Sequence, residues 1–220
     1  MADTDAITLY DYWRSSATYR VRIALNLKGL RYTQKAVHLL RDGGEQHGAA
    51  YRALNPQASV PTLVHGERVI RQSLAIVEYL DEIAAPSLLP AAPLARARVR
   101  ELALLIACDV HPLNNLRVAR YLEHEFGADA SARERWMRHW MAEGFRAFEA
   151  LLAADGATGR CCHGDAPTLA DACLVPQVYN ARRFGLDLAP FPTLSRVADH
   201  CLTLPAFDAA RPENQPDAVA

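Results

Sequence analysis

The sequence predicts an α/β domain followed by an all-helical domain, and three observations support this. In the first part of the chain, short apolar runs typical of strands alternate with helical patterns. A proline-rich stretch at residues 84–93 cannot continue a helix. Beyond it, apolar residues recur only at helical intervals. We therefore place the first domain at residues 1–85 and the second at residues 93–220.

The first domain is predicted to have the element order βαβαββα, which is that of a thioredoxin-like unit. In chain order the elements are a strand at residues 7–10, a helix that starts at Ser15 and Ser16, a strand at residues 32–37, a short helix at residues 49–54, a strand after Pro61, a hairpin at Gly66, a strand at residues 68–70 and a helix that starts at Ser73. Pro61 suits the first residue of a strand or a tight turn, because proline cannot donate to a sheet ladder. The sequence leaves the isomer of its peptide bond open.

Two of these helices begin at serines that are candidate anion contacts. At Ser15 and Ser16, and again at Ser73, a hydroxyl and several unpaired N–H groups meet the positive end of a helix dipole. Such a site favours a carboxylate or another anion, although helix capping alone would also explain the serines. Next to Pro61, the backbone of Val60 is expected to be free to pair with an extended ligand.

The second domain is predicted to be helical throughout. Helical patterns cover residues 96–126 and 133–154 and two shorter segments that start at Leu169 and Thr193. Thr168 and Asp171 form a variant of the capping box, which is a folding device rather than a catalytic pair. Residues 211–220, rich in proline and polar side chains, are expected to form a tail.

Composition favours a soluble cytoplasmic protein that binds neither nucleic acid nor membrane. The net charge of −1 provides no basic surface for nucleic acid or anionic lipid. No apolar run is long enough to span a bilayer, and residues 1–5 lack the basic and apolar regions of a signal peptide. The five cysteines are odd in number and show no C-x-x-C spacing, so we expect reduced thiols.

Motifs spread over nearly the whole chain carry a family resemblance. They are Arg14-Ser15-Ser16, Asp42-Gly43-Gly44, Leu54-Asn55-Pro56, Val60-Pro61-Thr62-Leu63, Gln72-Ser73-Leu74-Ala75-Ile76, Pro112-Leu113-Asn114-Asn115-Leu116-Arg117, Thr168-Leu169-Ala170-Asp171, Leu174-Val175-Pro176-Gln177-Val178, Arg183-Phe184 and Gln215-Pro216-Asp217. With these motifs the chain resembles the zeta-class glutathione transferases, and specifically the maleylacetoacetate and maleylpyruvate isomerases. One departure is visible, because Ala17 stands where the family commonly has cysteine.

The resemblance implies a glutathione transferase fold, glutathione as cofactor, a small dicarboxylate substrate and a homodimer. The implied reaction is cis–trans isomerisation of maleylacetoacetate to fumarylacetoacetate in tyrosine and phenylalanine breakdown, by reversible addition of the glutathione thiolate. Three alternatives remain open. They are a maleylpyruvate isomerase of gentisate breakdown, a glutathione transferase or dehalogenase of small α-haloacids, and a non-enzymatic binding protein with the glutathione transferase fold.

The resemblance also assigns the site residues. The implied catalytic group comprises Ser15, which faces the sulfur, Ser16, and Arg14 and Arg183, which hold carboxylates. The implied glutathione contacts are Ser15, Ser16, Ala17, Gln46, Val60, Gln72, Ser73, His111 and Asn115. Arg117 is a further candidate contact, with a solvated surface charge as the competing interpretation. We interpret Arg22, Arg120 and Arg182 as solvated charges.

We expect no metal site. Cys108, Asp109 and His111 superficially resemble a ligand cluster, but close neighbours on a helix point in different directions, and no fourth ligand is suitably spaced. Cys161, Cys162 and Cys173 are expected to be packing residues rather than nucleophiles.

Overall fold

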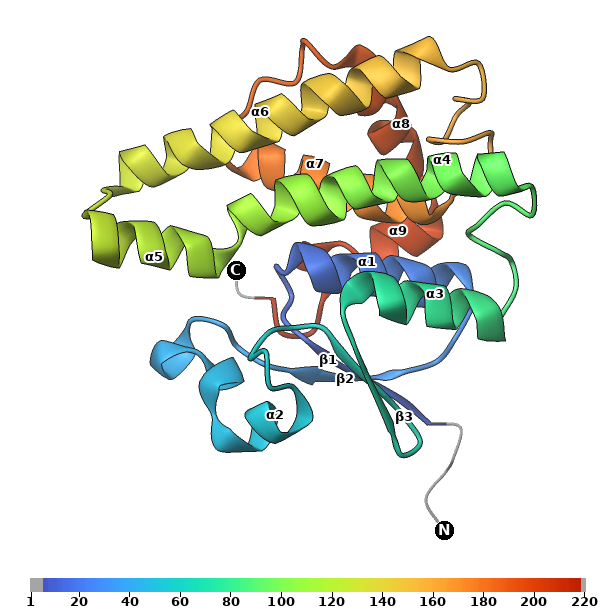
Figure 1. The fold of residues 1–220 in the computed structure, drawn as a ribbon. Coiled ribbons are helices and arrows are strands. Elements are labelled where there is room, and N and C mark those ends of the chain that lie inside the picture. Colours follow the sequence, from blue (N-terminus) through green and yellow to red (C-terminus); the bar gives the residue numbers. More distant parts are fainter. Residues whose placement is uncertain (1–5, 219–220) are drawn as a thin grey trace. The chain divides into compact units, whose positions relative to one another are not determined.

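The computed structural model describes residues 6–218, which form two compact units (Figure 1). Residues 1–5, where we expect no signal peptide, and residues 219–220, at the end of the predicted tail, lie outside the described residues. One unit comprises the chain up to Ser87 together with the chain from Leu204 onward, and the other is Leu88–Thr203. This grouping differs from the predicted second domain, residues 93–220, at its C-terminal end.

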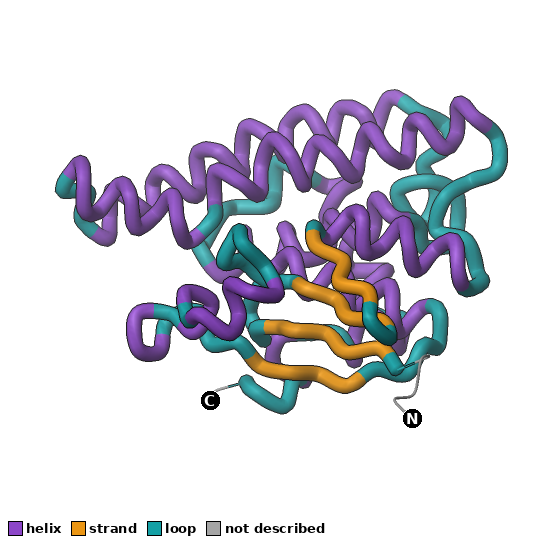
Figure 2. Tube along the Cα trace, turned by 60° about the horizontal axis from the view of Figure 1, so that its bottom comes forward, coloured by secondary structure: helices purple, strands orange, loops and turns teal. Residues whose placement is uncertain are grey.

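The first unit contains a four-stranded sheet in the order β2-β1-β3-β4 (Figure 2). The strands are β1 (Ile7–Asp11), β2 (Thr33–Ala36), β3 (Thr62–His65) and β4 (Arg68–Arg71). β1 is parallel to β2 and antiparallel to β3, and β3 is antiparallel to β4. Gly66 turns the β3–β4 hairpin with a φ of 57°, a backbone conformation that glycine adopts without a steric penalty. The thioredoxin-like order predicted from the sequence is confirmed.

Helices cover this sheet on both sides. They are α1 (Ser16–Leu27), α2 (Ala49–Leu54), α3 (Ser73–Ile83) and α9 (Pro205–Ala209). Figure 1 shows α1 and α3 together on one face of the sheet, with α2 on the other side. Helix α9, which the sequence pattern did not reveal, packs against α1. That packing explains why the C-terminal segment belongs to the first unit.

A buried ion pair lies between β1 and α1. Alternate residues of β1 face inward, so Asp11 lies on the same face as Leu9. Nη1 of Arg22 lies 2.9 Å from Oδ1 and 2.7 Å from Oδ2 of Asp11, and both side chains are 0% exposed. The expectation that Arg22 is a solvated charge is therefore wrong, because a carboxylate from the neighbouring strand neutralises it inside the core. Arg182, by contrast, forms an exposed ion pair with Asp199.

Lys28, just after α1, forms hydrogen bonds with α3 and with the start of the proline-rich segment. Its buried ammonium donates to Asp81 Oδ1 at 2.8 Å and to the carbonyl oxygens of Ala84 at 2.7 Å and Pro86 at 2.8 Å. These three acceptors satisfy all three N–H groups of the ammonium.

The second unit is predominantly helical. Its helices are α4 (Pro93–Leu104), α5 (Leu116–Phe126), α6 (Ala130–Ala154), α7 (Leu169–Arg183) and α8 (Pro192–Leu202). The single pattern predicted over residues 96–126 is interrupted by a π-helical turn (Leu105–Val110) and a 3-10 turn (His111–Asn114). Asn115 then caps α5, because its Oδ1 accepts the N–H of Arg117 at 3.1 Å. The residues proposed around this position therefore lie at a helix break rather than inside a continuous helix.

Over residues 6–218, we find no helix that combines the length and the apolar character needed to cross a bilayer.

Candidate functional site

Ser15 occupies the N-cap of α1, immediately after β1 and a short loop. Its Oγ accepts the N–H of Thr18 at 3.4 Å, which is a long and weak capping bond. Its backbone N–H donates to the carbonyl oxygen of Tyr12 at 2.9 Å, and that oxygen also accepts the Thr18 hydroxyl at 3.2 Å. The Ser15 hydroxyl therefore keeps its hydrogen available for an anion, while the backbone of the loop is held in place.

Ser16 and Ala17 form the first turn of α1 and, like Ser15, are partly exposed. The N–H groups of a first helical turn have no acceptor within the helix and carry the positive end of the dipole. A thiolate placed there would be stabilised relative to the thiol. Arg14 precedes this turn, and its guanidinium carbon lies 5.1 Å from the centroid of the Trp13 ring, which orients the charge by a cation–π contact.

A second anion-binding feature lies at the start of α3. Gln72 is the N-cap residue with a φ of 71°, and Ser73 is the first residue of the helix. The Oγ of Ser73 accepts a hydrogen bond from Nη1 of Arg20 on α1 at 3.2 Å, and both side chains are buried. The Ser73 hydroxyl can donate its own hydrogen to a carboxylate, with a guanidinium directly behind it. No pattern in the sequence marks Arg20 as part of this feature. Gln72 is exposed and donates to Oε1 of Gln57 at 2.8 Å.

Gln46 lies between the second strand and α2 and is only 4% exposed. Its Nε2 donates to the carbonyl oxygen of Leu39 at 3.4 Å, and its Oε1 is buried without a hydrogen-bond partner among the described residues. Gly44 makes room for this carboxamide, because a Cβ at Gly44 would lie 2.4 Å from Nε2 of Gln46. In the sequence, the pair Gly43-Gly44 is the pattern that could have indicated this need for a residue without a side chain.

Val60 belongs to a small buried apolar cluster. Val60 is buried together with Tyr12 and Trp13, the residues that precede Arg14. The Val60–Pro61 peptide bond is cis, which resolves the question left open by the sequence. The cluster therefore places the Val60–Pro61 turn near the start of the loop that carries Arg14 and Ser15.

In the second unit, His111, Asn115 and Arg117 follow one another through the helix break before and within α5. Arg117 is exposed and borders a surface hollow of about 480 Å³, together with Val118, Tyr121, Leu122 and Trp136. Arg183 lies in the last turn of α7, where it donates to Oδ1 of Asn180 at 2.9 Å. Its guanidinium carbon lies 4.1 Å from the centroid of the Phe184 ring.

Three residues outside the predicted site hold this helix break in place. Nε2 of Gln177 on α7 donates to Oδ1 of Asn114 at 3.1 Å, and Asn114 donates to the carbonyl oxygen of Met137 on α6 at 3.3 Å. Trp136 donates from its ring N–H to the carbonyl oxygen of Leu113 at 2.8 Å. Asn114 and Gln177 lie in two of the family motifs, but the sequence alone does not show that these motifs meet.

Similarity to known proteins extends over nearly the whole chain. The N-terminal domain of glutathione S-transferases matches residues 9–88. A probable maleylacetoacetate isomerase of Vibrio cholerae is 52% identical over 214 residues, which cover 97% of this chain and 99% of that protein. A maleylpyruvate isomerase of a Ralstonia species is 51% identical over 213 residues, which cover 96% of this chain and 99% of that protein.

Solved structures agree with this result. The holo structure of a maleylpyruvate isomerase, described as a bacterial glutathione S-transferase of the zeta class, superimposes with a TM-score of 0.94 at 50% identity and covers 96% of this chain and 100% of its own. The chain belongs to the zeta class of glutathione transferases. A maleylacetoacetate isomerase of Methylobacterium extorquens with bound malonate and glutathione has a TM-score of 0.93 at 41% identity and covers 97% of this chain and 100% of its own. The predicted glutathione transferase fold is thus confirmed.

The polar groups of the first unit fit glutathione, the cofactor of this family. The orphaned Oε1 of Gln46 is an acceptor for a peptide N–H, and a buried acceptor without a partner calls for a ligand or water. The Ser73 hydroxyl, backed by Arg20, suits a carboxylate, and the first turn of α1 suits a thiolate. One tripeptide carries all three of these chemical groups.

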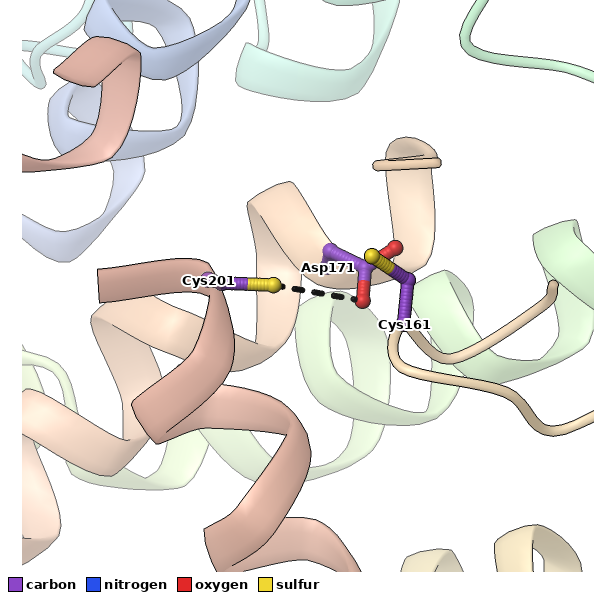
Figure 3. A group of neighbouring side chains, drawn as sticks. All are labelled: Cys161, Asp171 and Cys201. Atoms are coloured by element: carbon purple, nitrogen blue, oxygen red, sulfur yellow. Dashed lines mark hydrogen bonds between the residues drawn. The ribbon is translucent and has the colours of Figure 1, made fainter. Parts of the chain in front are cut away.

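A separate cluster of buried side chains in this transferase, shown in Figure 3, joins Asp171 to two cysteines. The Asp171 carboxylate accepts the N–H and the hydroxyl of Thr168, both at 2.8 Å, and the N–H of Cys162 at 2.8 Å. The predicted capping box is therefore confirmed, and the cap occupies the carboxylate. Cys201 also contacts Asp171, with Sγ 3.7 Å from Oδ1. The cluster is thus a folding element at the start of α7.

Two thiols beside Asp171, those of Cys162 and Cys201, are held in the protonated form, which makes them poor nucleophiles. The contact with Cys161 and burial together raise the pKa of Cys201 far above that of a free thiol. Burial, followed by the nearby Asp171 charge, raises the pKa of Cys162 well above its ordinary value. Cys161, Cys162 and Cys173 are all buried, which agrees with their interpretation as packing residues.

Proposed function

We propose that this zeta-class transferase is a glutathione-dependent isomerase that converts maleylacetoacetate to fumarylacetoacetate. The observation that carries the proposal is the N-terminus of α1, where Ser15, Ser16 and Ala17 present a hydroxyl and first-turn amides to one partly exposed position. The similarity over nearly the full length to relatives named as isomerases supports the same reaction.

Bound glutathione supplies a thiolate whose reversible addition turns a cis double bond into a single bond that can rotate. An unperturbed thiol has a pKa of about 8.5, so only a few per cent is ionised at neutral pH. Lowering that pKa by about two units corresponds to roughly 2.7 kcal/mol of preferential anion binding. In this proposal, Ser15 donates its hydroxyl hydrogen to the sulfur, and Ser16 and Ala17 contribute first-turn N–H groups.

Two arginines are assigned to the substrate. The planar guanidinium of Arg14 can bind a carboxylate through two parallel hydrogen bonds, and its contact with the Trp13 ring holds it in one orientation. Family resemblance assigns Arg183 to the other carboxylate of a maleyl diacid. The remaining proposed contacts are with glutathione, and they involve Gln46, Val60, Gln72, Ser73, His111, Asn115 and Arg117.

Maleylpyruvate is the second candidate substrate. The observation that favours it is the nearly equal identity to a relative named maleylpyruvate isomerase, at 51%, and to one named maleylacetoacetate isomerase, at 52%. We give maleylacetoacetate priority because the Arg14-Ser15-Ser16 sequence matches its class well.

The cellular setting is part of the proposal. We infer a cytoplasmic enzyme, because all five cysteines are free thiols and the cytoplasm supplies glutathione. We also infer a homodimer, as is common in the superfamily. Sedimentation at micromolar concentration should give twice the monomer mass, and a monomer alone would contradict the dimer.

The test is a comparison of substrates and variants. The enzyme should isomerise maleylacetoacetate or maleylpyruvate only when glutathione is present, and glutathione should not be consumed. Ser15→Ala should lower kcat by about 10- to 1,000-fold, because the anion loses a hydrogen bond. Conjugation of glutathione to α-haloacids without any isomerase activity would refute the assignment.

The arginine roles are tested by comparing two electrophiles. Arg14→Ala and Arg183→Ala should impair the maleyl diacid more than the neutral chlorodinitrobenzene, because only the diacid needs a guanidinium. Arg182→Ala is the matched control, since Arg182 is exposed, adjacent to Arg183 and paired with Asp199. If the Arg14 and Arg183 variants lose the activities on the diacid and on chlorodinitrobenzene equally, these arginines have a structural role and do not bind the substrate.

A further inference from the structure

The C-terminal segment of the chain holds the loop that carries Arg14 and Ser15. Oδ2 of Asp217 accepts the backbone N–H of Trp13 at 3.0 Å. The carbonyl oxygen of the same Trp13 accepts Nη2 of Arg22 at 2.9 Å. Both backbone polar groups of Trp13 are therefore fixed by side chains from elsewhere in the first unit.

The segment that presents Asp217 is itself well anchored. The buried carboxamide of Gln215 donates to the carbonyl oxygens of Ala209 at 3.0 Å and Arg211 at 2.7 Å. The N–H of Ala218 donates to the carbonyl oxygen of Gln215 at 3.0 Å. Ala218 also packs against the apolar cluster that contains Trp13. Asp217 thus lies between two anchored residues, and its carboxylate has a defined position.

The Asp217 carboxylate is also connected to the buried ion pair. Nε2 of Gln34 lies 2.7 Å from Oδ2 of Asp11 and 3.5 Å from Oδ1 of Asp217. Arg22 completes the arrangement, because it binds Asp11, the Trp13 carbonyl oxygen and, through Nε at 3.0 Å, the carbonyl oxygen of Ala210. β1, α1 and the C-terminal segment therefore meet at the backbone of Trp13.

The position of Trp13 determines the positions of both proposed functional residues. Arg14 follows Trp13 directly, and its guanidinium stacks over the Trp13 ring. Ser15 comes next, and its N–H is held by the carbonyl oxygen of Tyr12, on the other side of Trp13. A rotation of the Trp13 peptide would therefore displace the thiolate donor and the carboxylate-binding group together.

We propose that Asp217 is a positioning residue, which orients the Trp13–Ser15 loop for thiolate stabilisation by accepting the Trp13 N–H. This inference rests on the proposed function of Ser15. The acceptor is a carboxylate oxygen, and hydrogen bonds to carboxylates are stronger than those to neutral acceptors. Because the 3.0 Å contact spans nearly the whole chain length, no local sequence pattern could reveal it.

The experiment compares Asp217→Ala with Asp217→Asn and with Glu213→Ala, an exposed acid of the same segment that serves as the control. The first readout does not depend on function. Amide hydrogen exchange at Trp13, followed by NMR, should be faster in Asp217→Ala than in the wild type. It should stay close to wild type in Asp217→Asn, whose amide oxygen can still accept the bond, and in Glu213→Ala.

The second readout is chemical. The glutathione thiolate absorbance of the Asp217→Ala complex should titrate at higher pH than that of the wild type, and kcat should fall about 10-fold. In a Ser15→Ala background, Asp217→Ala should cause a smaller fall in kcat than in the wild type, because the part of its effect that acts through Ser15 is already lost and only the part that acts through Arg14 remains. Asp217→Asn should recover most of the activity. An effect on stability alone would leave the thiolate titration unchanged.

The possible results test the positioning role of Asp217 separately from the proposed isomerase function. An unchanged Trp13 exchange rate, or an unchanged thiolate titration in Asp217→Ala, would overturn the positioning role and leave the proposed function intact. If glutathione bound to the wild type shows no thiolate absorbance at pH values below the pKa of free glutathione, the proposed function is wrong. The positioning role then fails with it. Faster exchange together with a raised titration midpoint supports the inference.

Discussion

Replacing Arg22 with alanine should destabilise this transferase severely. The guanidinium donates two hydrogen bonds to Asp11, at 2.9 and 2.7 Å, one to the carbonyl oxygen of Trp13 and one to that of Ala210. Its removal leaves the Asp11 carboxylate buried, with Gln34 as its remaining side-chain donor among the described residues. Breaking a buried ion pair in this way costs about 3–5 kcal/mol of unfolding free energy. For a chain of this size, that corresponds to a fall in Tm of roughly 6–20 °C.

The matched control is Arg182→Ala. Arg182 also pairs with a carboxylate, Asp199, at 2.6 Å, but that pair is exposed and should contribute only about 0–1 kcal/mol. Both variants and the wild type should be unfolded in urea and by heat at one fixed protein concentration, because the midpoints of the proposed homodimer would depend on that concentration.

A third variant tests the cause of the loss. Replacing both members of the pair, as Asp11→Asn with Arg22→Met, removes both buried charges and should cost less than Arg22→Ala alone. If Arg22→Ala lowers the unfolding free energy no more than Arg182→Ala does, the inference of a buried and mutually dependent pair is wrong.

Four further results are expected. Gly44→Ala should weaken glutathione binding in calorimetry, since a Cβ there would overlap the Gln46 carboxamide, and unchanged affinity would remove Gln46 from the site. Ser73→Ala should weaken glutathione binding by about 1–3 kcal/mol while the protein still folds, with a lower Tm because Nη1 of the buried Arg20 loses the Ser73 oxygen as an acceptor, and unchanged affinity in calorimetry would place the carboxylate of glutathione elsewhere. A thiol reagent should label the native protein only at Cys108, the exposed cysteine, whereas the unfolded chain should label at all five, and fast labelling of further sites would contradict the burial of the other four. Ala17→Cys should increase inhibition by thiol reagents without raising turnover, because the nucleophile belongs to glutathione; a large gain in kcat would oppose this view.

The sequence by itself determined the features that depend on neighbouring residues. Thr168 and Asp171 are close enough in the chain to cap α7, and the predicted box is present. The same holds for the strand after Pro61, the turn at Gly66 and the start of α1 at the Ser15 cap. In each case, the backbone geometry is set by a residue within one helical turn or one hairpin, so a local pattern is sufficient.

The tertiary structure alone decided which charged and polar residues lie inside. Arg22 and Arg182 look alike in the sequence, but only Arg22 meets a buried carboxylate, that of Asp11 on another element. In the same way, Asp217 reaches the backbone of Trp13 from the far end of the chain. Burial of a charge depends on a partner that the fold brings close, and the positions of such partners are not encoded in any local periodicity.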